Sequence, residues 1–415
     1  MTDRVVIVGG GHIGIACAHY LQQDGHDVTV IDQGTIGGAC SHANCGFIVP
    51  SHVLPLTTPD APVEGVRSIF QPRAAFRVKP QLRGSLVRWM WEFGRRCTHT
   101  KMLEASATLH SLLEASASHY RTLLRTPELD CGWQDNGMLF VFRSTRALDD
   151  FAGTDTLLTS AYGLSARFID GGDLQEFEPA LLDGLAGAYF YADDSHLRPD
   201  KLNAAWTSLL EKRGVKFVEQ CRLEAIERQD GKVSGLQTSR GAISADHYVF
   251  AAGAWSSELA AGLDCEIPVE PGKGYSVTMA APETMPTHPM LMPEKHIGVT
   301  PFDDGLRIAS MMEFAGFDSS IPPFRIRQLQ DSAKPFLRHP TGPVIEDTWY
   351  GWRPMTWDSL PIIGRTAGLS NALLATGHNM LGLSLAPVTG KAIADLVAER
   401  PTEIPLNAVS PTRFS

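Results

Sequence analysis

The first 32 residues combine a strand pattern, a glycine-rich turn and a helix pattern. Residues 4–8 (Arg-Val-Val-Ile-Val) are a short apolar run of the kind found in buried parallel strands. After the turn, apolar side chains recur at helical spacing from about Ile13 to Asp24, and Gly25 is suited to end the helix. Residues 27–32 then predict a second strand. Together these elements predict a β-α-β unit at the start of the chain.

Further pieces of the same sheet are predicted far along the chain. The run at residues 246–253 predicts a buried strand that ends at a glycine, and residues 373–377 predict another. A helix is predicted at 199–213 with a strand at 215–219, and the final helix is predicted at about 386–399. The pieces of one nucleotide-binding sheet are thus spread over the start, the middle and the end of the sequence.

The segments between these pieces carry different patterns. Residues 50–80 are rich in proline and have little periodicity, so a long loop is predicted there. Residues 81–126 have apolar positions at helical spacing, and residues 133–142 alternate like a strand. Two shorter helices and several strand-like runs are also predicted, the helices at 147–162 and 173–178 and the strands within 268–350.

This order of elements predicts an α/β protein with two interleaved domains. The first is a Rossmann-type nucleotide-binding domain, and the second is an α+β substrate domain built on a mixed or antiparallel sheet. The nucleotide-binding domain is assigned to residues 1–46, 196–267 and 351–400. The substrate-binding domain is assigned to residues 47–195 and 268–350, and residues 401–415 form a C-terminal tail.

Composition narrows the kind of partner and the compartment. The chain has 415 residues and a formal net charge of −10, which disfavours nucleic acid as a partner. Seven cysteines without a Cys-x-x-Cys pair argue against a disulfide framework, and Cys40 and Cys45 lack histidines at zinc spacing, so no metal is predicted. The first apolar run leads directly into the glycine turn and leaves no room for a secretory leader. Because no apolar stretch of about 18 residues occurs, a cytoplasmic protein is expected.

One segment allows an alternative location. Residues 82–96 mix Trp89, Trp91 and Phe93 with arginines, a composition typical of helices at a membrane interface. The alternative is therefore a peripheral position on the inner face of the membrane. The favoured interpretation is an amphipathic helix that packs on its own domain.

The glycine-rich turn has the spacing of a dinucleotide-binding loop. In Gly9-x-Gly11-x-x-Gly14 the first glycine permits the tight turn, the second lets the backbone approach a pyrophosphate, and the third allows close packing of helix on strand. The helix N-terminus offers free N–H groups to the phosphates. Asp32, at the end of the second strand, is placed to accept a ribose hydroxyl and disfavours NADP. The contacts expected here are Gly9, Gly11, His12, Ile13, Gly14, Asp32 and Gln33.

This loop alone does not separate FAD from NAD, and three later segments favour FAD. Residues 37–46 are mostly small, which lets the backbone approach a flat ring. Residues 251–256 end a buried strand at a glycine, and residues 377–382 precede the last helix. The further contacts expected with FAD are Ser41, Asn44, Gly46, Leu223, Ala252, Gly253, Trp255, Gly377, His378, Leu381 and Gly382.

In their order and in their residues, these motifs resemble those of the FAD-dependent amine oxidoreductases of the glycine oxidase and D-amino-acid oxidase superfamily. Within it, the sequence is most similar to the bacterial D-amino-acid dehydrogenases, which include D-hydroxyproline dehydrogenases. The residues that carry this similarity are Ser41-His-Ala-Asn44-Cys-Gly46, Pro50-Ser51-His52 and Pro55-Leu56. The resemblance extends from residue 4 to about residue 398 and is weakest from about 100 to 190.

The resemblance implies oxidative deamination of a D-amino acid, including cyclic imino acids such as D-proline or hydroxy-D-proline. A hydride would pass from Cα to N5 of a non-covalently bound FAD, and the electrons would go to a quinone or another carrier. Two alternatives stay open. One is an oxygen-using amine oxidase of the glycine or sarcosine type, and the other is an FAD-carrying chain that works with partner subunits in a larger dehydrogenase complex.

The resemblance also implies roles for individual side chains. Arg353, in Gly-Trp-Arg-Pro, would clamp the substrate carboxylate in a bidentate pair. His378 either contributes to the flavin site or is a structural histidine. His52 is a candidate for substrate contact or for deprotonation of the amine, with a purely structural histidine as the favoured alternative.

Two further candidates lie in the predicted substrate domain. Related oxidases often place a tyrosine in the mid-chain strand, and residues 294–301 contain none. Tyr275 is therefore a candidate second partner of the carboxylate. Glu313 is a candidate partner of the substrate amine, with an ion pair inside the sheet as the alternative. Met380 stands where the dehydrogenases commonly have a smaller residue, which would reshape the pocket.

Overall fold

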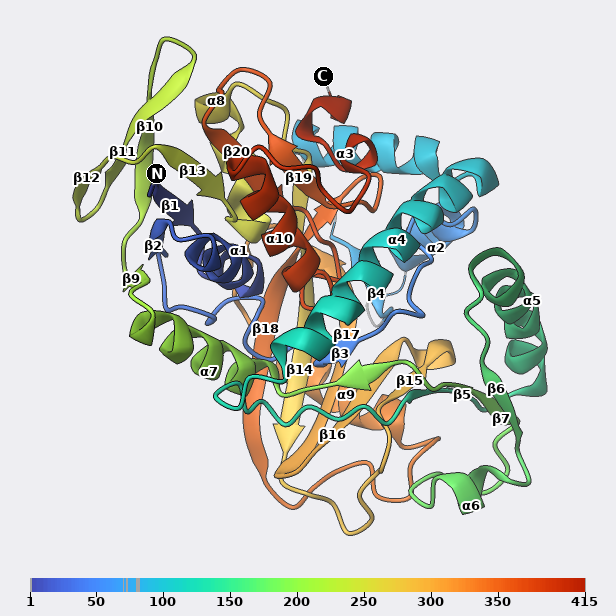
Figure 1. Ribbon diagram of the computed structural model, residues 1–415. Coiled ribbons are helices and arrows are strands. Elements are labelled where there is room, and N and C mark those ends of the chain that lie inside the picture. The colour runs from blue at the N-terminus through green and yellow to red at the C-terminus, as the bar shows by residue number, and fades with distance from the viewer. Residues whose placement is uncertain (1, 70, 72–73, 80–82, 415) are drawn as a thin grey trace.

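The computed structural model describes residues 2–69, 71, 74–79 and 83–414, and two large β-sheets organise them (Figure 1). The first sheet has six strands in the order β19-β20-β13-β1-β2-β9. Neighbouring strands are parallel except for β19 and β20, which are antiparallel. The strands are β1 Arg4–Val8, β2 Asp27–Ile31, β9 Lys216–Val218, β13 His247–Phe250, β19 Ile362–Arg365 and β20 Ala372–Thr376. The predicted α/β sheet, assembled from distant parts of the sequence, is confirmed.

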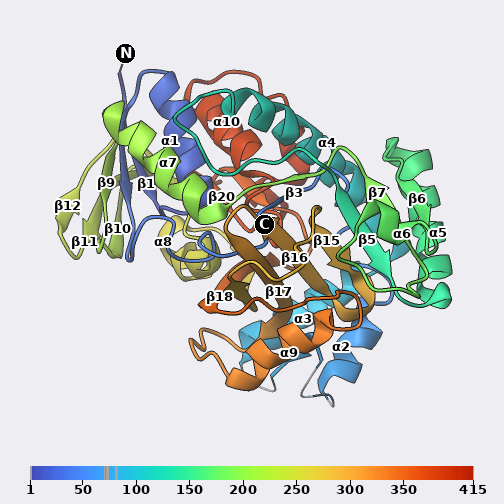
Figure 2. The same cartoon turned by 90° about the horizontal axis from the view of Figure 1, so that it is seen from below.

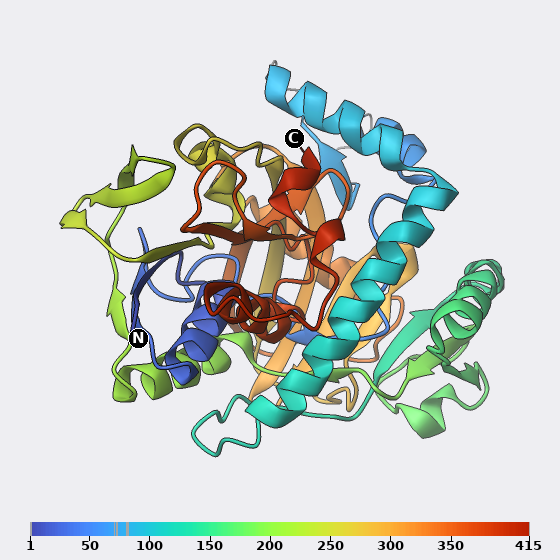
Figure 3. The same cartoon turned by 45° about the horizontal axis from the view of Figure 1, so that its top comes forward.

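Four helices pack around this sheet: α1 His12–Gln23, α4 His99–Leu123, α7 Pro199–Lys212 and α10 Ala386–Val397. The backbones of α1 and α10 approach closely, because a Cβ atom at Gly390 would lie 2.5 Å from the carbonyl oxygen of Ala16. The long helix α4 packs on α10 (Figures 1 and 3), and the Tyr120 hydroxyl donates to the Leu383 carbonyl over 2.8 Å. A helix that the sequence assigns to the substrate domain thus packs on the nucleotide-binding part.

The second sheet is mixed and has nine strands. Its order is β18-β14-β17-β16-β15-β5-β7-β6, with β4 beside β17. The pairs β15–β5 and β17–β4 are parallel and the others are antiparallel. The strands are β4 Phe76–Val78, β5 Met138–Phe142, β6 Arg167–Asp170, β7 Gly187–Tyr191, β14 Val269–Met279, β15 Met290–Met292, β16 Ile297–Phe302, β17 Gly305–Phe314 and β18 Ile345–Thr356. This confirms the predicted mixed or antiparallel sheet.

Further helices flank the second sheet. α9 packs against β14, β16 and β17, while α5 packs on β5 and β7. Seen from below, α9 lies at the same end of the molecule as α2 and α3 (Figure 2). The bounds are α2 Ala61–Ile69, α3 Gly84–Arg96, α5 Thr145–Tyr162, α6 Leu174–Phe177 and α9 Pro323–Ala333.

Smaller elements complete the fold. A two-stranded sheet of β3 and β8 and a three-stranded sheet of β10, β11 and β12 are separate from the two large sheets. Their bounds are β3 Phe47–Ile48, β8 Ser195–His196, β10 Leu223–Gln229, β11 Lys232–Thr238 and β12 Gly241–Ile243, with the short helix α8 at Ala260–Leu263. The proposed domain limits stay a prediction, and β18 runs across the limit set at residue 351.

The prediction of one long loop over residues 50–80 is wrong in part, because α2 and β4 form within it. β4 pairs in parallel with the end of β17, where Phe76 lies opposite Met312. A three-residue strand carries too short a pattern to be recognised locally, and it forms because β17 offers a free edge. The predicted start of the next helix, at residues 81–82, lies outside the described residues, and the observed helix α3 begins at Gly84.

The tryptophan-rich helix α3 is anchored on one side only. Trp89 is buried, its indole N–H donates to the Pro268 carbonyl over 3.0 Å, and its ring stacks on Phe93. Trp91, in contrast, is 68% exposed. Trp89 thus supports packing of the helix on its own protein, and contact with a membrane surface stays a prediction. Within the described ranges, the structure has no helix with the length and apolar character needed to span a bilayer.

Buried histidines are expected to make the protein sensitive to acid. Burial lowers the pKa of His12, His19 and His196 to about 4 and that of His378 to about 3. Below pH 6.5, the ordinary pKa of histidine, these side chains bind protons in the unfolded chain but stay neutral in the folded one. Their contribution to the free energy of unfolding is therefore complete above pH 6.5 and is lost toward pH 4. Asp194 acts in the opposite direction, because burial raises its pKa to about 7. One carboxyl opposes five imidazoles, since burial also lowers the pKa of His52 to about 4.

The measurement is urea unfolding at pH 7.5 and pH 5.0, where the midpoint is expected to be lower at pH 5.0. The variant His19→Gln should reduce this difference, whereas His99→Gln, at an exposed position, should leave it unchanged. Equal midpoints at the two pH values would show that these imidazoles do not control stability.

Candidate active site

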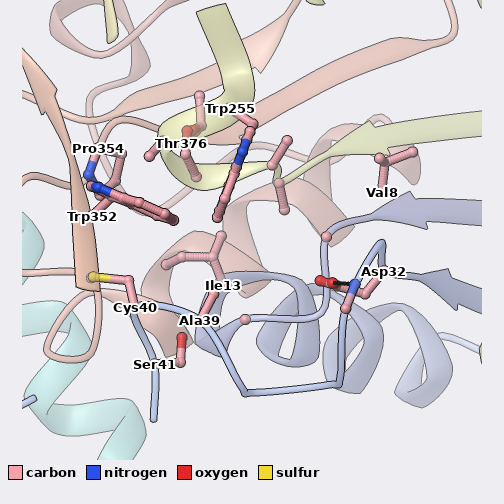
Figure 4. A pocket seen from close by; sticks show the side chains of 18 of the residues that line it. Val8, Ile13, Asp32, Ala39, Cys40, Ser41, Trp255, Trp352, Pro354 and Thr376 are labelled. Carbon is pink, nitrogen blue, oxygen red and sulfur yellow. Dashed lines mark hydrogen bonds between the residues drawn. The ribbon is translucent and has the colours of Figure 1, made fainter. Parts of the chain in front are cut away.

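A cavity of about 780 Å³ extends from the carboxyl ends of β1 and β2 to the inner edge of β18 (Figure 4). Figure 4 shows Asp32 at one side of this cavity and Cys40, Trp352 and Pro354 together at the other. The carboxyl ends of parallel strands are where doubly wound sheets bind their ligands. The cavity therefore lies where the sequence predicts the dinucleotide.

The glycine turn has little room for any side chain. Gly9 has a backbone φ of +110°, and a Cβ atom there would lie 2.3 Å from the Ala251 carbonyl oxygen. At Gly14 a Cβ atom would lie 1.9 Å from the Gly9 carbonyl oxygen. α1 begins after Gly11, a cap residue without a side chain, and Ser41 Oγ accepts the N–H of His12 over 3.0 Å. The turn thus brings backbone N–H groups to the cavity wall, as anion binding requires.

Asp32 is fixed by two backbone donors. Its Oδ2 accepts the N–H of Gly10 and its Oδ1 accepts the N–H of Gly34, both over 2.7 Å. Each carboxylate oxygen retains capacity for a further bond. Because Asp32 lines the cavity, this geometry supports the predicted contact with a ribose hydroxyl.

Most of the predicted cofactor contacts line this cavity. Those that do are Gly9, Gly11, His12, Ile13, Asp32, Gln33, Ser41, Asn44, Leu223, Ala252, Gly253, Trp255, His378 and Gly382. Gly14, Gly46, Gly377 and Leu381 are absent from the lining. Gly46 has a structural role instead, because it has a φ of +77° and a Cβ atom there would lie 2.0 Å from the Leu197 carbonyl oxygen.

Arg353 on β18 also lines the cavity, and its neighbours in the chain, Trp352 and Pro354, lie at the side opposite Asp32 (Figure 4). Arg353 is half-buried, and its Nη1 donates to the Met311 carbonyl over 2.7 Å. Among the described residues, no carboxylate forms an ion pair with it. Burial raises the pKa of the Cys40 thiol, and the positive charge of Arg353 opposes this rise. The cavity thus ends at a cation for which the described part of the chain offers no counter-ion.

Tyr275 and Glu313 lie on the other face of the second sheet. Gly274 shares a face with Arg353, because a Cβ atom at Gly274 would lie 2.2 Å from Arg353 Nη1. Alternation along β14 turns Tyr275 away from that face, into the cluster beneath α9. Its hydroxyl donates to Glu313 over 2.6 Å, and Glu313 also pairs with Arg325. The predicted substrate contacts of both residues are therefore corrected to a buried structural network.

The two candidate histidines differ in position. His378 lines the cavity, and its Nε2 lies 2.9 Å from the Thr389 hydroxyl. His52 is not among the cavity residues, and its ring lies 5.6 Å from the ring of Phe140. Burial lowers the pKa of His52 to about 4 and that of His378 to about 3, so both imidazoles are neutral and weakly basic. For His52 the geometry favours the structural alternative.

Comparison with known proteins defines the family. The model of the family described as DAO, FAD dependent oxidoreductase, matches residues 4–396. The chain belongs to this family. Its fold is similar to glycine oxidase from Geobacillus kaustophilus, with 24% identity, complete coverage of both chains and a TM-score of 0.80. It is also similar to glycine oxidase from Bacillus cereus ATCC 14579, with 21% identity, 97% and 96% coverage and a TM-score of 0.75. A third similar structure is L-proline dehydrogenase from P. horikoshii, with 20% identity, 100% and 98% coverage and a TM-score of 0.73.

This DAO-family chain is an FAD-dependent oxidoreductase, and the cavity fits the cofactor. The N-terminus of α1 would hold the pyrophosphate, and Asp32 would hold the adenosine ribose at one end. The flavin end of the cavity is then the opposite one, formed by Cys40, Asn44 and Arg353. The volume of the whole cavity is of the size expected for a large cofactor.

Several cavity residues escaped the sequence analysis. Trp352 and Pro354 flank Arg353 in the same motif, so their closeness to Arg353 in the sequence could have identified them. Asn379 lies within the segment recognised before the last helix. The others lie in loops, in a short 3-10 helix or at the end of β20, and their approach to one another depends on the tertiary fold. They include Thr35, Cys40, Ser239, Glu258 and Thr376.

Proposed function

We propose that the protein oxidises an amino acid whose carboxylate is held by Arg353. The observation that carries this proposal is the guanidinium at the flavin end of the cavity, without a carboxylate partner among the described residues. A partly buried guanidinium without a counter-ion is costly, and its planar fork matches a carboxylate. When FAD is bound, it supplies the acceptor for the hydride that leaves Cα.

The carbonyl of Met311 supports this role by fixing the guanidinium. It accepts from Nη1 and leaves the other N–H groups of Arg353 for a ligand. Met311 has a left-handed φ of +74°, next to a register shift between β14 and β17. Such bulges commonly re-aim groups beside functional sites. This one directs a backbone carbonyl to the guanidinium.

No histidine is required as a base in this proposal. His378 is the candidate that lines the cavity, and burial lowers its pKa to about 3, which makes its imidazole a weak proton acceptor. The substrate amine is therefore expected to bind after it has lost its proton to solvent. Geometry then supplies most of the rate, because Arg353 orients the carbon that is oxidised.

We further propose a D-amino acid as substrate, with a cyclic imino acid such as D-proline or hydroxy-D-proline as the preferred class. The similarity of the motifs at Ser41–Gly46 and Pro50–His52 to those of bacterial D-amino-acid dehydrogenases supports this choice. Trp255 and Trp352 add aromatic surface to the cavity, and their rings lie 5.6 Å apart. An apolar ring would be compatible with such a wall.

The test is a dye-linked assay of the purified protein with paired D- and L-amino acids, including both prolines. Turnover of D-isomers with release of the 2-oxo acid or cyclic imine is expected. Activity with L-isomers alone would contradict the stereochemical proposal, while turnover of neither isomer would contradict the amino acid class.

We propose a quinone or another carrier as the electron acceptor, and oxygen is the second candidate. Two of the similar structures carry the name glycine oxidase. Production of peroxide at the rate of substrate turnover would favour the oxidase. Partner subunits would be indicated by an inactive isolated chain that regains activity with co-purifying proteins.

A further inference from the structure

Three side chains of the second sheet hold three successive carbonyl groups of a cavity loop. Ser276 on β14 donates to the Ala43 carbonyl over 2.8 Å. Arg307 on β17 donates to the Asn44 carbonyl over 2.9 Å. Thr300 on β16 donates to the Cys45 carbonyl over 2.7 Å. These three donors fasten the backbone of the loop to the sheet that also carries Arg353.

The register of the strands places the three donors together. Thr300 lies directly opposite Arg307 in the β16–β17 pair. Ser276 lies opposite Ala309, two residues along β17 from Arg307 and therefore on the same face. All three donor side chains are buried. They form one polar cluster on this face of the sheet, and the cluster faces the loop.

Arg307 is the most constrained member of this cluster. It is 2% exposed, its Nε donates to the Thr278 hydroxyl over 2.9 Å, and Asp200 lies 3.7 Å from Nη2. Burial lowers the pKa of its guanidinium, which shows that its charge is poorly solvated. Burying a guanidinium is costly, and the position and direction of this one are fixed. Its remaining strong contact is the Asn44 carbonyl.

The loop that receives these bonds forms part of the cavity wall. Cys40, Ser41 and Asn44 line the cavity, while Ser276, Thr300 and Arg307 are not among the lining residues. Ser41 Oγ accepts the N–H of His12 at the start of α1 over 3.0 Å. The loop is thus held by the cofactor-binding helix through Ser41 and by the second sheet through its carbonyl groups.

We propose that Arg307, Thr300 and Ser276 are positioning residues that set the shape of the flavin end of the cavity without touching the cofactor. By fixing the carbonyl groups of residues 43–45, they place the Asn44 backbone and the adjoining wall against which the flavin ring binds. FAD affinity and the electronic environment of the flavin then depend on the second sheet. This positioning role requires only that the protein binds FAD, and it is independent of which substrate is oxidised.

The first test removes one donor without changing shape, in the variant Thr300→Val. Losing a neutral hydrogen bond should raise the Kd for FAD about fivefold, measured by quenching of flavin fluorescence on binding to apoprotein. Thr366→Val is the matched control, because Thr366 is equally buried and donates to the Leu369 carbonyl, remote from the loop. The control should bind FAD as the unmodified protein does. Ser276→Ala removes the neighbouring donor and gives a second measurement.

The second test uses Arg307→Lys, which keeps the charge and loses the planar fork. The Kd for FAD should rise about tenfold, because bonds to charged donors are stronger, and the visible absorption bands of bound FAD should shift. Arg325→Lys is the matched control, since Arg325 is also fully buried but lies on the other face of the same sheet with Glu313. It should change thermal stability while the Kd and the flavin spectrum stay the same.

A positioning role at the flavin end and a purely structural role predict different results. If Thr300→Val, Ser276→Ala and Arg307→Lys lower only the melting temperature, and keep the Kd for FAD and the flavin spectrum, the residues are structural and the proposal fails. If Arg325→Lys alters the flavin spectrum as much as Arg307→Lys does, the effect is general to the sheet, and the proposal also fails.

Discussion

Replacing Arg353 by methionine is expected to lower kcat/KM for an amino acid about a thousandfold. The variant keeps an unbranched, flexible side chain and removes the cation that we propose as the partner of the substrate carboxylate. Losing one partner of a desolvated charged pair costs about 4 kcal/mol, which corresponds to this factor. The other arginine of the described lining is Arg222, which adjoins Leu223 rather than the segment of Arg353, so we expect no neighbouring cation to replace Arg353. Steady-state kinetics with the best substrate measure the loss.

Two controls assign the loss to the carboxylate. Arg353→Lys should recover part of the activity, since an ammonium keeps the charge but not the bidentate geometry. A decarboxylated analogue of the substrate should react slowly and at similar rates with the original protein and the methionine variant. FAD content should be unchanged, because the proposed pyrophosphate and ribose contacts lie at the opposite end of the cavity. If the methionine variant keeps more than half of the original kcat/KM, Arg353 does not bind the substrate carboxylate.

The variant Gly14→Ala is expected to weaken FAD binding by about ten- to a hundredfold. The added methyl group would lie 1.9 Å from the Gly9 carbonyl oxygen, so α1 must move away from β1. Overpacking at such a contact costs about 1–3 kcal/mol, and the displaced helix carries the N–H groups that would bind the phosphates. The measurement is the Kd for FAD with apoprotein, together with the melting temperature with and without FAD.

Gly153→Ala is the matched control for this substitution. Gly153 also lies inside a helix, α5, but a Cβ atom there would have open space around it. Alanine is the better helix former, so this variant should keep FAD affinity and gain up to about 1 kcal/mol of stability. Tight FAD binding by Gly14→Ala would mean that the turn does not need the close contact between Gly9 and Gly14.

The glycine turn and Asp32 were predictable because their chemistry is local. Residues 9–14 and Asp32 belong to one β-α-β unit, and the short chain between them fixes their relative positions. Arg353 was recognised from a motif of four residues. The structure adds its place at the cavity end and its bond to Met311, neither of which follows from the sequence around position 353.

Tyr275 and Glu313 show where sequence reasoning failed. The face on which a strand residue points depends on register, and one residue of shift turns it to the opposite side. The register between β14 and β17 shifts near Lys273 and Tyr275, beside the left-handed Met311. Neither the shift nor the position of α9 can be derived from local patterns. The bonds from Ser276, Thr300 and Arg307 to the cavity loop are equally non-local, since more than 200 residues separate donors from acceptors.

Mixing the oxidised protein with substrate in the absence of oxygen tests the central claim most directly. This measurement isolates reduction of the flavin from every later acceptor, and it is followed as the loss of visible flavin absorbance. We expect D-amino acids, and cyclic imino acids in particular, to bleach the flavin rapidly, and their decarboxylated analogues to do so slowly. Bleaching by the analogues as fast as by the amino acids, or no bleaching by any amino acid, would contradict an oxidoreductase that holds its substrate carboxylate at Arg353.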